Sequence, residues 1–465
     1  MVKTKKILQL LRDFESRNVV FTEPGGSWPI VWERAKGVHV WDADGRKYLD
    51  LTAAFGVAAA GHANPKVVRA GQVQLARLPH AMGDVHPHAP KAQLARELSR
   101  ITFERWTKPR DARRRTPDSI RGKTIFSNSG FEAVESALKT AMLATGKRGV
   151  IAFEGAYHGL GYGALNATHR NFFRGPFRPQ LGEFGHFVPF LAATELSRLK
   201  SKNKNRNEPA HVGCYEIEKR IRSLFRRESI GAILVEPIQA RGGINVPPPD
   251  FLPLLRRLCD GQDALLILDE IYTGFGRTGE WFACEHNGVV PDLICLGKAL
   301  TGGFPLSACV GRADVMDAAW PASRGEAIHT STFLGNPVGC AMALAQIKEI
   351  ERLNLCGRSA ELGTFLLSQL QSAIGNRQSA IQIRGLGLMV GVELCLPDGK
   401  PATEVARRVT KKMLRRGFIM LPEGEHANVI SFTPPLTITK AQLAEAIIAL
   451  KEVLTAEVAA GARRL

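Results

Sequence analysis

The 465-residue sequence predicts an α/β fold in which a mostly parallel sheet is flanked by helices. Two observations support this prediction. First, apolar runs alternate with helical stretches such as residues 131–145 between about residues 60 and 330. Second, the runs are apolar almost without interruption, which is typical of strands covered by helices on both faces. The predicted strands span residues 123–127, 149–153, 232–237, 264–270, 292–297 and 306–311.

The start of the chain predicts a hairpin. In residues 38–51, alternating apolar residues flank the turn Asp44-Gly45. A short turn of this kind between two alternating runs is a strong hairpin signal. We expect this segment, as part of residues 1–60, to pack with a domain formed by the end of the chain.

The end of the chain predicts a second, smaller α+β domain. The expected elements are an amphipathic helical region at about 338–375, strands at about 381–395 and 428–433, and a closing helix from about 440. The sequence therefore divides into an N-terminal segment (1–60), a large domain (61–335) and a small C-terminal domain (336–465).

The chain is basic, with 62 Lys and Arg against 44 Asp and Glu, a formal net charge of +18. Such a charge raises nucleic acid or an anionic membrane as partners, but charge alone determines neither fold nor chemistry. Residues 105–124 and 198–206, expected to be surface loops, carry 11 of the 18 excess charges. No apolar run approaches the roughly 18 residues of a membrane span. The eight cysteines form neither a C-x-x-C pair nor a zinc-type cluster. We therefore expect a cytoplasmic protein with reduced thiols and no metal site, which binds neither nucleic acid nor a membrane.

Asp269 lies at the end of one strongly apolar predicted strand, and Lys298 directly follows another. The carboxyl ends of parallel strands meet at one edge of a sheet, where ligands bind. A carboxylate buried there is costly unless it meets a cation. An acid and an amine at such an edge suit pyridoxal 5'-phosphate (PLP), which needs a counter-ion and a covalent lysine. Taken alone, the pair fits a loop cap and a surface lysine better.

A Ser-Gly turn at residues 129–130 follows one predicted strand and opens the helix at 131–145. Free N–H groups and the helix dipole make such a helix start an anion site, suited to a phosphate ester. The alternative is an ordinary capping box, because Glu132 lies three residues after Ser129. Tyr157, among glycines after another strand, is suited to stack on a planar ring. The adjacent His158 is either a general base or a packed, hydrogen-bonded histidine.

Together these motifs resemble the class III aminotransferases, fold-type I PLP-dependent enzymes that include 4-aminobutyrate, ornithine and acetylornithine transaminases. The resemblance spans nearly the whole chain, from VWDADGRKYLDL (40–51) and GHANP (61–65) to SFTPPLTIT (431–439). Its most specific part is DEIYTGFGRTG (269–279) with GKAL (297–300), and HTSTFLGNP (329–337) adds independent support. It implies a large PLP-binding domain and a smaller α+β domain.

The resemblance also implies a role for each matching residue. Lys298 would form the Schiff base with PLP and shuttle a proton, and Asp269 would keep the pyridine nitrogen protonated. The other implied cofactor contacts are Ser129, Gly130 and Phe131 at the phosphate, Tyr157 and Ile271 on the two ring faces, Tyr272, and Thr332 from the neighbouring subunit. The active unit would be a homodimer with its active site at the subunit interface.

Four positions depart from the family pattern. Tyr272 stands where many members have Gln, and Leu160 where the 4-aminobutyrate enzymes have Arg. Ser431 replaces an arginine that binds the substrate α-carboxylate, and Arg241 replaces the glutamate that pairs with it. Since a guanidinium binds carboxylates through two parallel N–H groups, we hypothesise that Arg241 contacts the substrate carboxylate. The alternative is a surface arginine in a loop. Phe55 is expected to line the substrate pocket and limit donor size.

The sequence therefore predicts a PLP-dependent transaminase. It would move an amino group from an ω-amino acid or amine to an oxo acid, such as pyruvate or 2-oxoglutarate, by a ping-pong mechanism. An aminomutase or amino-acid racemase of the same fold would use the same Lys298 and Asp269, and an acetylornithine or ornithine aminotransferase is a further alternative. A nucleic-acid-binding protein is supported by the net charge alone.

Overall fold

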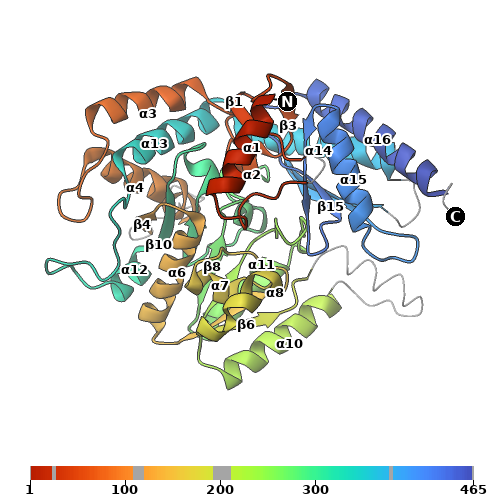
Figure 1. The fold of residues 1–465 in the computed structure, drawn as a ribbon. Coiled ribbons are helices and arrows are strands. Elements are labelled where there is room, and N and C mark those ends of the chain that lie inside the picture. The colour runs from red at the N-terminus through yellow and green to blue at the C-terminus, as the bar shows by residue number, and fades with distance from the viewer. Residues whose placement is uncertain (1, 24–27, 108–119, 192–210, 376–380, 463–465) are drawn as a thin grey trace.

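The computed structural model describes residues 2–23, 28–107, 120–191, 211–375 and 381–462 (Figure 1). Of the two basic stretches, residues 108–119 and the whole of 198–206 lie outside the described residues. The ends of the first stretch belong to regular elements, because residues 105–107 close a helix and residues 122–124 begin a strand. Within the described residues, no helix is long and apolar enough to cross a membrane.

A seven-stranded sheet forms the centre of the large domain, with the order β4-β10-β9-β8-β7-β5-β6. The strands are β4 (Gly122–Ser127), β5 (Gly149–Phe153), β6 (Gly185–Val188), β7 (Ile230–Val235), β8 (Leu265–Asp269), β9 (Leu293–Leu296) and β10 (Ser307–Arg312). Only β10 runs against its neighbours, pairing antiparallel with β4 and β9. The predicted mostly parallel α/β sheet is therefore confirmed.

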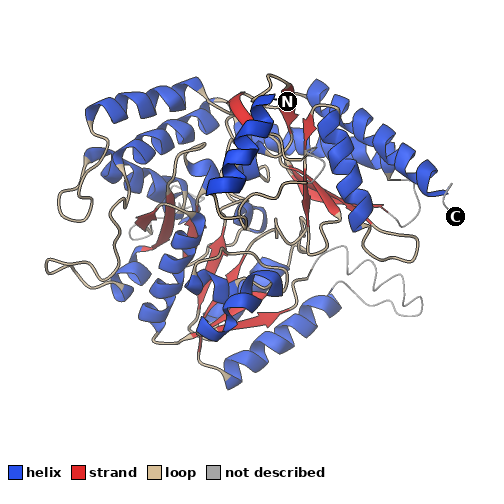
Figure 2. Cartoon of the chain, viewed as in Figure 1, coloured by secondary structure: helices blue, strands red, loops and turns tan. Residues whose placement is uncertain are grey.

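Helices cover both faces of this sheet (Figure 2). Successive side chains of a strand point to opposite faces; in β7, Ile233 and Val235 therefore enter one apolar cluster and Ala232 and Leu234 the other. One face packs on α4 (Ala89–Ile101), α10 (His211–Arg227) and α11 (Phe251–Asp260). The opposite face packs on α6 (Gly130–Thr145), α7 (Tyr162–Ala167) and α12 (Ala313–Ala319). Burial on both faces explains the uninterrupted apolar runs.

The large domain also contains α3 (Pro65–Arg77), α5 (Phe103–Thr107), α8 (Asn171–Arg174), η1 (Gly175–Gln180), η2 (Ala283–Asn287) and η3 (Lys298–Leu300). The short helix α2 (Ala53–Gly56) lies in the N-terminal segment.

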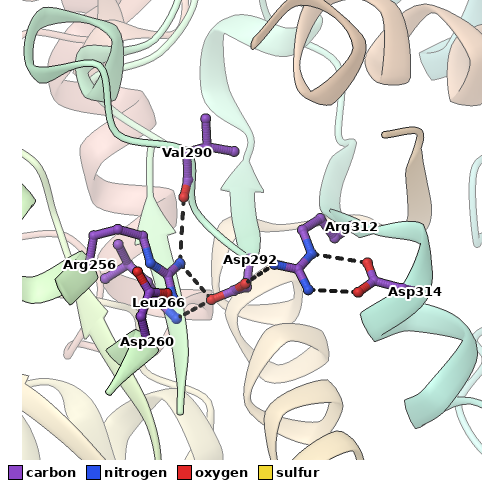
Figure 3. Close-up of polar contacts among 7 residues, drawn as sticks. All are labelled: Arg256, Asp260, Leu266, Val290, Asp292, Arg312 and Asp314. Carbon is purple, nitrogen blue, oxygen red and sulfur yellow. Dashed lines mark hydrogen bonds and ion pairs between the residues drawn. The ribbon is translucent and has the colours of Figure 1, made fainter. Parts of the chain in front are cut away.

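A charged network braces the amino ends of the parallel strands (Figure 3). The buried Asp292, just before β9, accepts from Arg256 Nη1 at 2.7 Å and Leu266 N at 2.8 Å. Its other oxygen accepts from Arg312 Nη1 at 3.0 Å, and Arg312 also forms an ion pair with Asp314. A buried carboxylate is stable only when cations and N–H groups satisfy it, so this network holds β8, β9 and β10 in register at one edge. The carboxyl ends of the same parallel strands lie on the opposite side of the sheet and are free to form the site.

The two ends of the chain meet in a second sheet of order β1-β2-β3-β13. The predicted hairpin is present as β2 (His39–Asp42) and β3 (Lys47–Asp50), with β1 (Trp32–Lys36) beside it. β13 (Phe418–Ile419) pairs in parallel with β3, bringing a segment from near residue 418 against the N-terminal segment. The chain begins with α1 (Val2–Phe14).

A four-stranded antiparallel sheet, β11-β12-β15-β14, forms the rest of the C-terminal region. Its strands are β11 (Ile381–Leu386), β12 (Met389–Leu394), β14 (Leu421–Glu423) and β15 (Val429–Phe432). The helices are α14 (Leu355–Ile374), α15 (Thr403–Arg415) and α16 (Lys440–Ala462), which lie together in Figure 1.

The helical region predicted at 338–375 consists of two helices. α13 (Pro337–Arg352) ends before Asn354, whose φ of +47° is left-handed and breaks the helix. α13 packs against α3 and α4, whereas α14 packs against α16 and β11. The first of the two helices therefore lies with the large domain, although it follows residue 335.

Candidate active site

The carboxyl edge of the parallel sheet carries a cluster of titratable side chains. Asp269 ends β8, Glu236 follows β7, Lys298 follows β9, and His158 follows β5. All four line one cavity of about 420 Å³. The remaining lining residues are Gly130, Phe131, Tyr157, Gly159, Leu160, Ala240, Arg241, Ile271 and Tyr272. The cavity therefore collects the predicted lysine, acid, helix start and arginine, which are far apart in sequence.

Lys298 begins the short helix η3 in a left-handed conformation, with φ at +42°. A non-glycine residue held in this region is strained by about 1–3 kcal/mol, and such strain is often found at functional sites. Its Nζ lies 4.1 Å from the centre of the Tyr272 ring. Burial lowers the pKa of Lys298 to about 8, against the opposing effects of Asp269 and Glu236. A much larger fraction of the amine is therefore unprotonated near neutral pH than for an ordinary lysine.

Asp269 is held by two contacts. Its Oδ2 lies 2.8 Å from His158 Nδ1, and its Oδ1 accepts a hydrogen bond from Ile271 N at 3.1 Å. His158 is itself buried, and its backbone N–H donates to Thr168 Oγ1. Of the two readings of His158, the hydrogen-bonded histidine is the one observed. The contacts fix the orientation of the carboxylate in the cavity.

Glu236 is a site residue that the sequence reasoning missed. It is 6% exposed and accepts from Tyr157 N at 3.0 Å and Ala240 N at 3.1 Å. Burial raises the pKa of Glu236 to about 7, with His158 opposing the shift and Asp269 adding to it. The signal for it was present, because Glu236 directly follows an apolar strand in the same way as Asp269.

The first turn of α6 lines the cavity through Gly130 and Phe131. The capping box raised as the alternative is present: the backbone N–H and hydroxyl of Ser129 both donate to Glu132 Oε2 at 2.7 Å. Ser307, at the start of β10, donates its hydroxyl to Ser129 O at 2.6 Å. The amide groups of a helix start lie before the first intrahelical bonds and attract anions. The cap therefore orders a helix start that can still bind a phosphate.

Tyr157 and Ile271 supply apolar walls of the cavity. A Cβ at Gly130 would lie 3.1 Å from Ile271 Cδ1, and one at Gly297 would lie 3.3 Å from Ile271 Cγ2. Glycine at both positions lets Ile271 approach the helix start and the residue before Lys298. An amine, a carboxylate, a helix start and apolar walls facing one cavity fit the aldehyde, ring nitrogen, phosphate and ring of PLP.

Tyr272 lines the cavity with its ring, while its hydroxyl points to the small domain. The hydroxyl lies 3.1 Å from Thr433 Oγ1, which in turn donates to Thr52 O at 3.2 Å. Because Thr433 uses its proton on Thr52, the Tyr272 hydroxyl is the donor in the first contact. Burial raises the pKa of Tyr272 to about 12, so the hydroxyl stays protonated.

Arg241 lies in the cavity wall rather than on an open surface loop, with 31% of its side chain exposed. Its Nη1 donates to Glu423 Oε2 at 2.7 Å. Its guanidinium carbon also lies 5.9 Å from the centre of the Tyr157 ring. Glu423, at the end of β14, is a second acid that the sequence reasoning missed, since nothing local pairs it with Arg241.

Three further candidates lie outside the set of cavity-lining residues. Phe55 is 49% exposed, in a run of left-handed residues that begins at Ala53. Ser431 is buried in β15 and donates its hydroxyl to Leu421 O at 3.1 Å. Thr332 is exposed in the segment between α12 and α13.

The α/β fold, with a lysine, a carboxylate and a helix start lining one cavity, is the arrangement expected of a PLP-dependent enzyme. The chain belongs to the class III aminotransferase family, which it matches over residues 21–454. It is therefore a transaminase.

Individual relatives agree with this assignment. The chain is 37% identical to the 5-aminovalerate aminotransferase DavT of Pseudomonas aeruginosa, over 91% of this chain and 93% of that protein. It is 36% identical to the putrescine aminotransferase of Pectobacterium atrosepticum, over 97% of this chain and 88% of that protein. Among solved structures, a Bacillus anthracis aminotransferase superposes with a TM-score of 0.86 at 27% identity, covering 98% of this chain and 99% of the other.

Proposed function

We propose that this transaminase takes ω-amino acids and terminal amines as donors, and an oxo acid such as pyruvate or 2-oxoglutarate as acceptor. The observation that supports it is the place of Arg241, a cation in the same cavity wall as Lys298. An ω-amino acid has an amine at one end and a carboxylate at the other, so it matches an amine-reactive group and a cation in one cavity. The relatives named for 5-aminovalerate and putrescine act on terminal amines.

The residues that match the family pattern have proposed roles in and around the cavity. Bound PLP supplies the electron sink that makes the hydrogen on the amine-bearing carbon acidic. Lys298 holds the cofactor and then moves that proton as general acid and base. Asp269, oriented by His158, carries the negative charge toward the ring nitrogen. Ser129, Gly130 and Phe131 bind the phosphate at the start of α6, and Tyr157, Ile271 and Tyr272 enclose the ring.

Arg241 binds the donor carboxylate in this proposal. Replacing it with Ala should raise the KM for 5-aminovalerate about tenfold or more, because charge-assisted hydrogen bonds contribute roughly 1.5–3 kcal/mol. The KM for pentylamine, which has the same chain without the carboxylate, should change little. Arg178→Ala is the matched control, because Arg178 pairs with Glu183 on an exposed surface. An equal loss with both donors would refute the carboxylate role.

The requirement for an oxo acid separates transamination from the isomerase alternatives. A transaminase turns over only when donor and acceptor are both supplied, and double-reciprocal plots should be parallel lines. A racemase or aminomutase would consume a single amino acid without an acceptor. Lys298→Ala should abolish turnover and the lysine-bound cofactor detected by mass spectrometry after borohydride reduction.

We also propose a homodimer in the cytoplasm. Thr332 is exposed and lies outside the set of lining residues, which is compatible with a contact to the phosphate of a neighbouring subunit. The eight cysteines lie within the described residues and form no disulfide with one another, as in a reducing compartment. Analytical ultracentrifugation should give a dimer, and mixing Lys298→Ala with Thr332→Ala subunits should produce some dimers with one intact site.

A further inference from the structure

Arg241, the cation proposed for the substrate carboxylate, is already paired with an internal carboxylate. Glu423 Oε2 accepts from Arg241 Nη1 at 2.7 Å. The Glu423 side chain is only 2% exposed, whereas the Arg241 side chain is 31% exposed and lines the cavity. A substrate therefore contacts Arg241 before Glu423. The charge of this arginine is already partly neutralised by the more deeply buried Glu423.

Glu423 is held in place by its backbone. It ends β14, which pairs with β15, and the next residue donates from Gly424 N to Arg241 O at 3.1 Å. Arg170 Nη2 donates to Gly424 O at 2.8 Å and to Glu425 O at 2.7 Å. These contacts fix the acid relative to the backbone of Arg241. The long Arg241 side chain is thus the part of the pair that can move.

We propose that Glu423 is a specificity-determining residue that competes with the substrate carboxylate for Arg241. A substrate with a carboxylate replaces Glu423 as the partner of Arg241, and it accepts two parallel hydrogen bonds from the guanidinium. An amine without a carboxylate leaves Arg241 paired with Glu423. The apolar chain of the amine then contacts a cavity wall whose two charges cancel. This inference rests on the proposed function and explains how one cavity accepts both donor classes.

Glu423 is not left as an uncompensated buried charge when Arg241 turns away. Burial raises the pKa of the Glu423 carboxyl, so it can take up a proton. Lys298 and Arg170 are the other nearby cations that act on it. The competition therefore has a modest cost that a bidentate substrate contact can exceed.

The test uses the holoenzyme with Glu423→Gln, which keeps the shape of the side chain and removes its charge. Valerate, a carboxylate without an amine, is the binding probe, measured by calorimetry. Loss of the competitor should tighten valerate binding and lower the KM for 5-aminovalerate by about tenfold. The KM for pentylamine should rise, because an unpaired cation now faces its apolar chain. Glu425→Gln, which changes an exposed acid two residues along, should alter neither.

Other outcomes are informative in different ways. Weaker valerate binding in Glu423→Gln would mean that Glu423 positions Arg241, which overturns the competition and leaves the proposed function intact. Unchanged binding would also overturn it. If Arg241→Ala itself leaves valerate binding unaltered, the carboxylate role of Arg241 in the proposed function fails instead. Glu423→Asp, which shortens the acid, should tighten valerate binding to an intermediate degree and serves if the glutamine variant does not fold.

Discussion

Asp269 Oδ2 and His158 Nδ1 lie 2.8 Å apart although 111 residues separate them, and both side chains are buried. Asp269 ends β8 and His158 follows β5, two strands of the same sheet with β7 between them. The contact therefore spans the carboxyl ends of three strands and holds the carboxylate in the cavity wall. A buried carboxylate can pair with a cationic group in the cavity only if its orientation is fixed. After rotation its oxygen atoms would no longer point at that group. The contact links the architecture of the sheet to the chemistry of the site.

We expect His158→Gln to weaken PLP binding without unfolding the protein. Loss of the contact leaves Asp269 with the hydrogen bond from Ile271 N, so the carboxylate is less well oriented. The dissociation constant of PLP, measured by titrating the apoenzyme, should rise about tenfold, the effect of one charge-assisted hydrogen bond. His286→Gln is the control, since His286 contacts Thr278 instead. Unaltered PLP affinity in His158→Gln would show that Asp269 does not need its partner.

The reactivity of Lys298 should rise as pH increases through about 8. Burial lowers its pKa from the ordinary lysine value to about 8, so the amine is protonated below that pH and free above it. Reductive methylation of the apoenzyme, followed by mass spectrometry, measures this directly, with the exposed Lys3 as the internal reference. A midpoint near 10 would contradict the shift. Asp269→Asn, which removes the charge that most opposes the shift, should move the midpoint to lower pH.

We expect Gly159→Ala to disturb the cofactor cavity. Gly159 has φ at +115°, and a Cβ there would lie 2.3 Å from Phe131 Cβ at the start of α6. The substitution combines backbone strain of about 1–3 kcal/mol with a clash, so both thermal stability and PLP affinity should fall. Gly288→Ala provides the comparison, because Gly288 has φ at +61° and open space around it. A similar loss of PLP affinity in both variants would mean that the clash with Phe131 is unimportant.

Much of the fold is determined by local sequence pattern. The apolar runs of β5, β7, β8 and β9 are buried on both faces, as is typical of the strands of a parallel sheet covered by helices. The predicted hairpin at 38–51 is also present, because its turn and alternation are local signals. The division of 338–375 into two helices was missed, since Asn354 breaks the helix only where α13 and α14 turn to different partners.

The site divides in the same way. The apolar runs already predicted that Asp269 and Lys298 lie at strand ends, and a parallel sheet brings its strand ends together on one side. The pattern does not show that Lys298 lies over the ring of Tyr272, or that Glu236 joins Asp269 in the cavity. The partner of Arg241 could be found only from the folded chain, because Glu423 lies 182 residues further along. The contact between these two residues depends on how the two domains pack, and no local sequence pattern predicts that they lie close together.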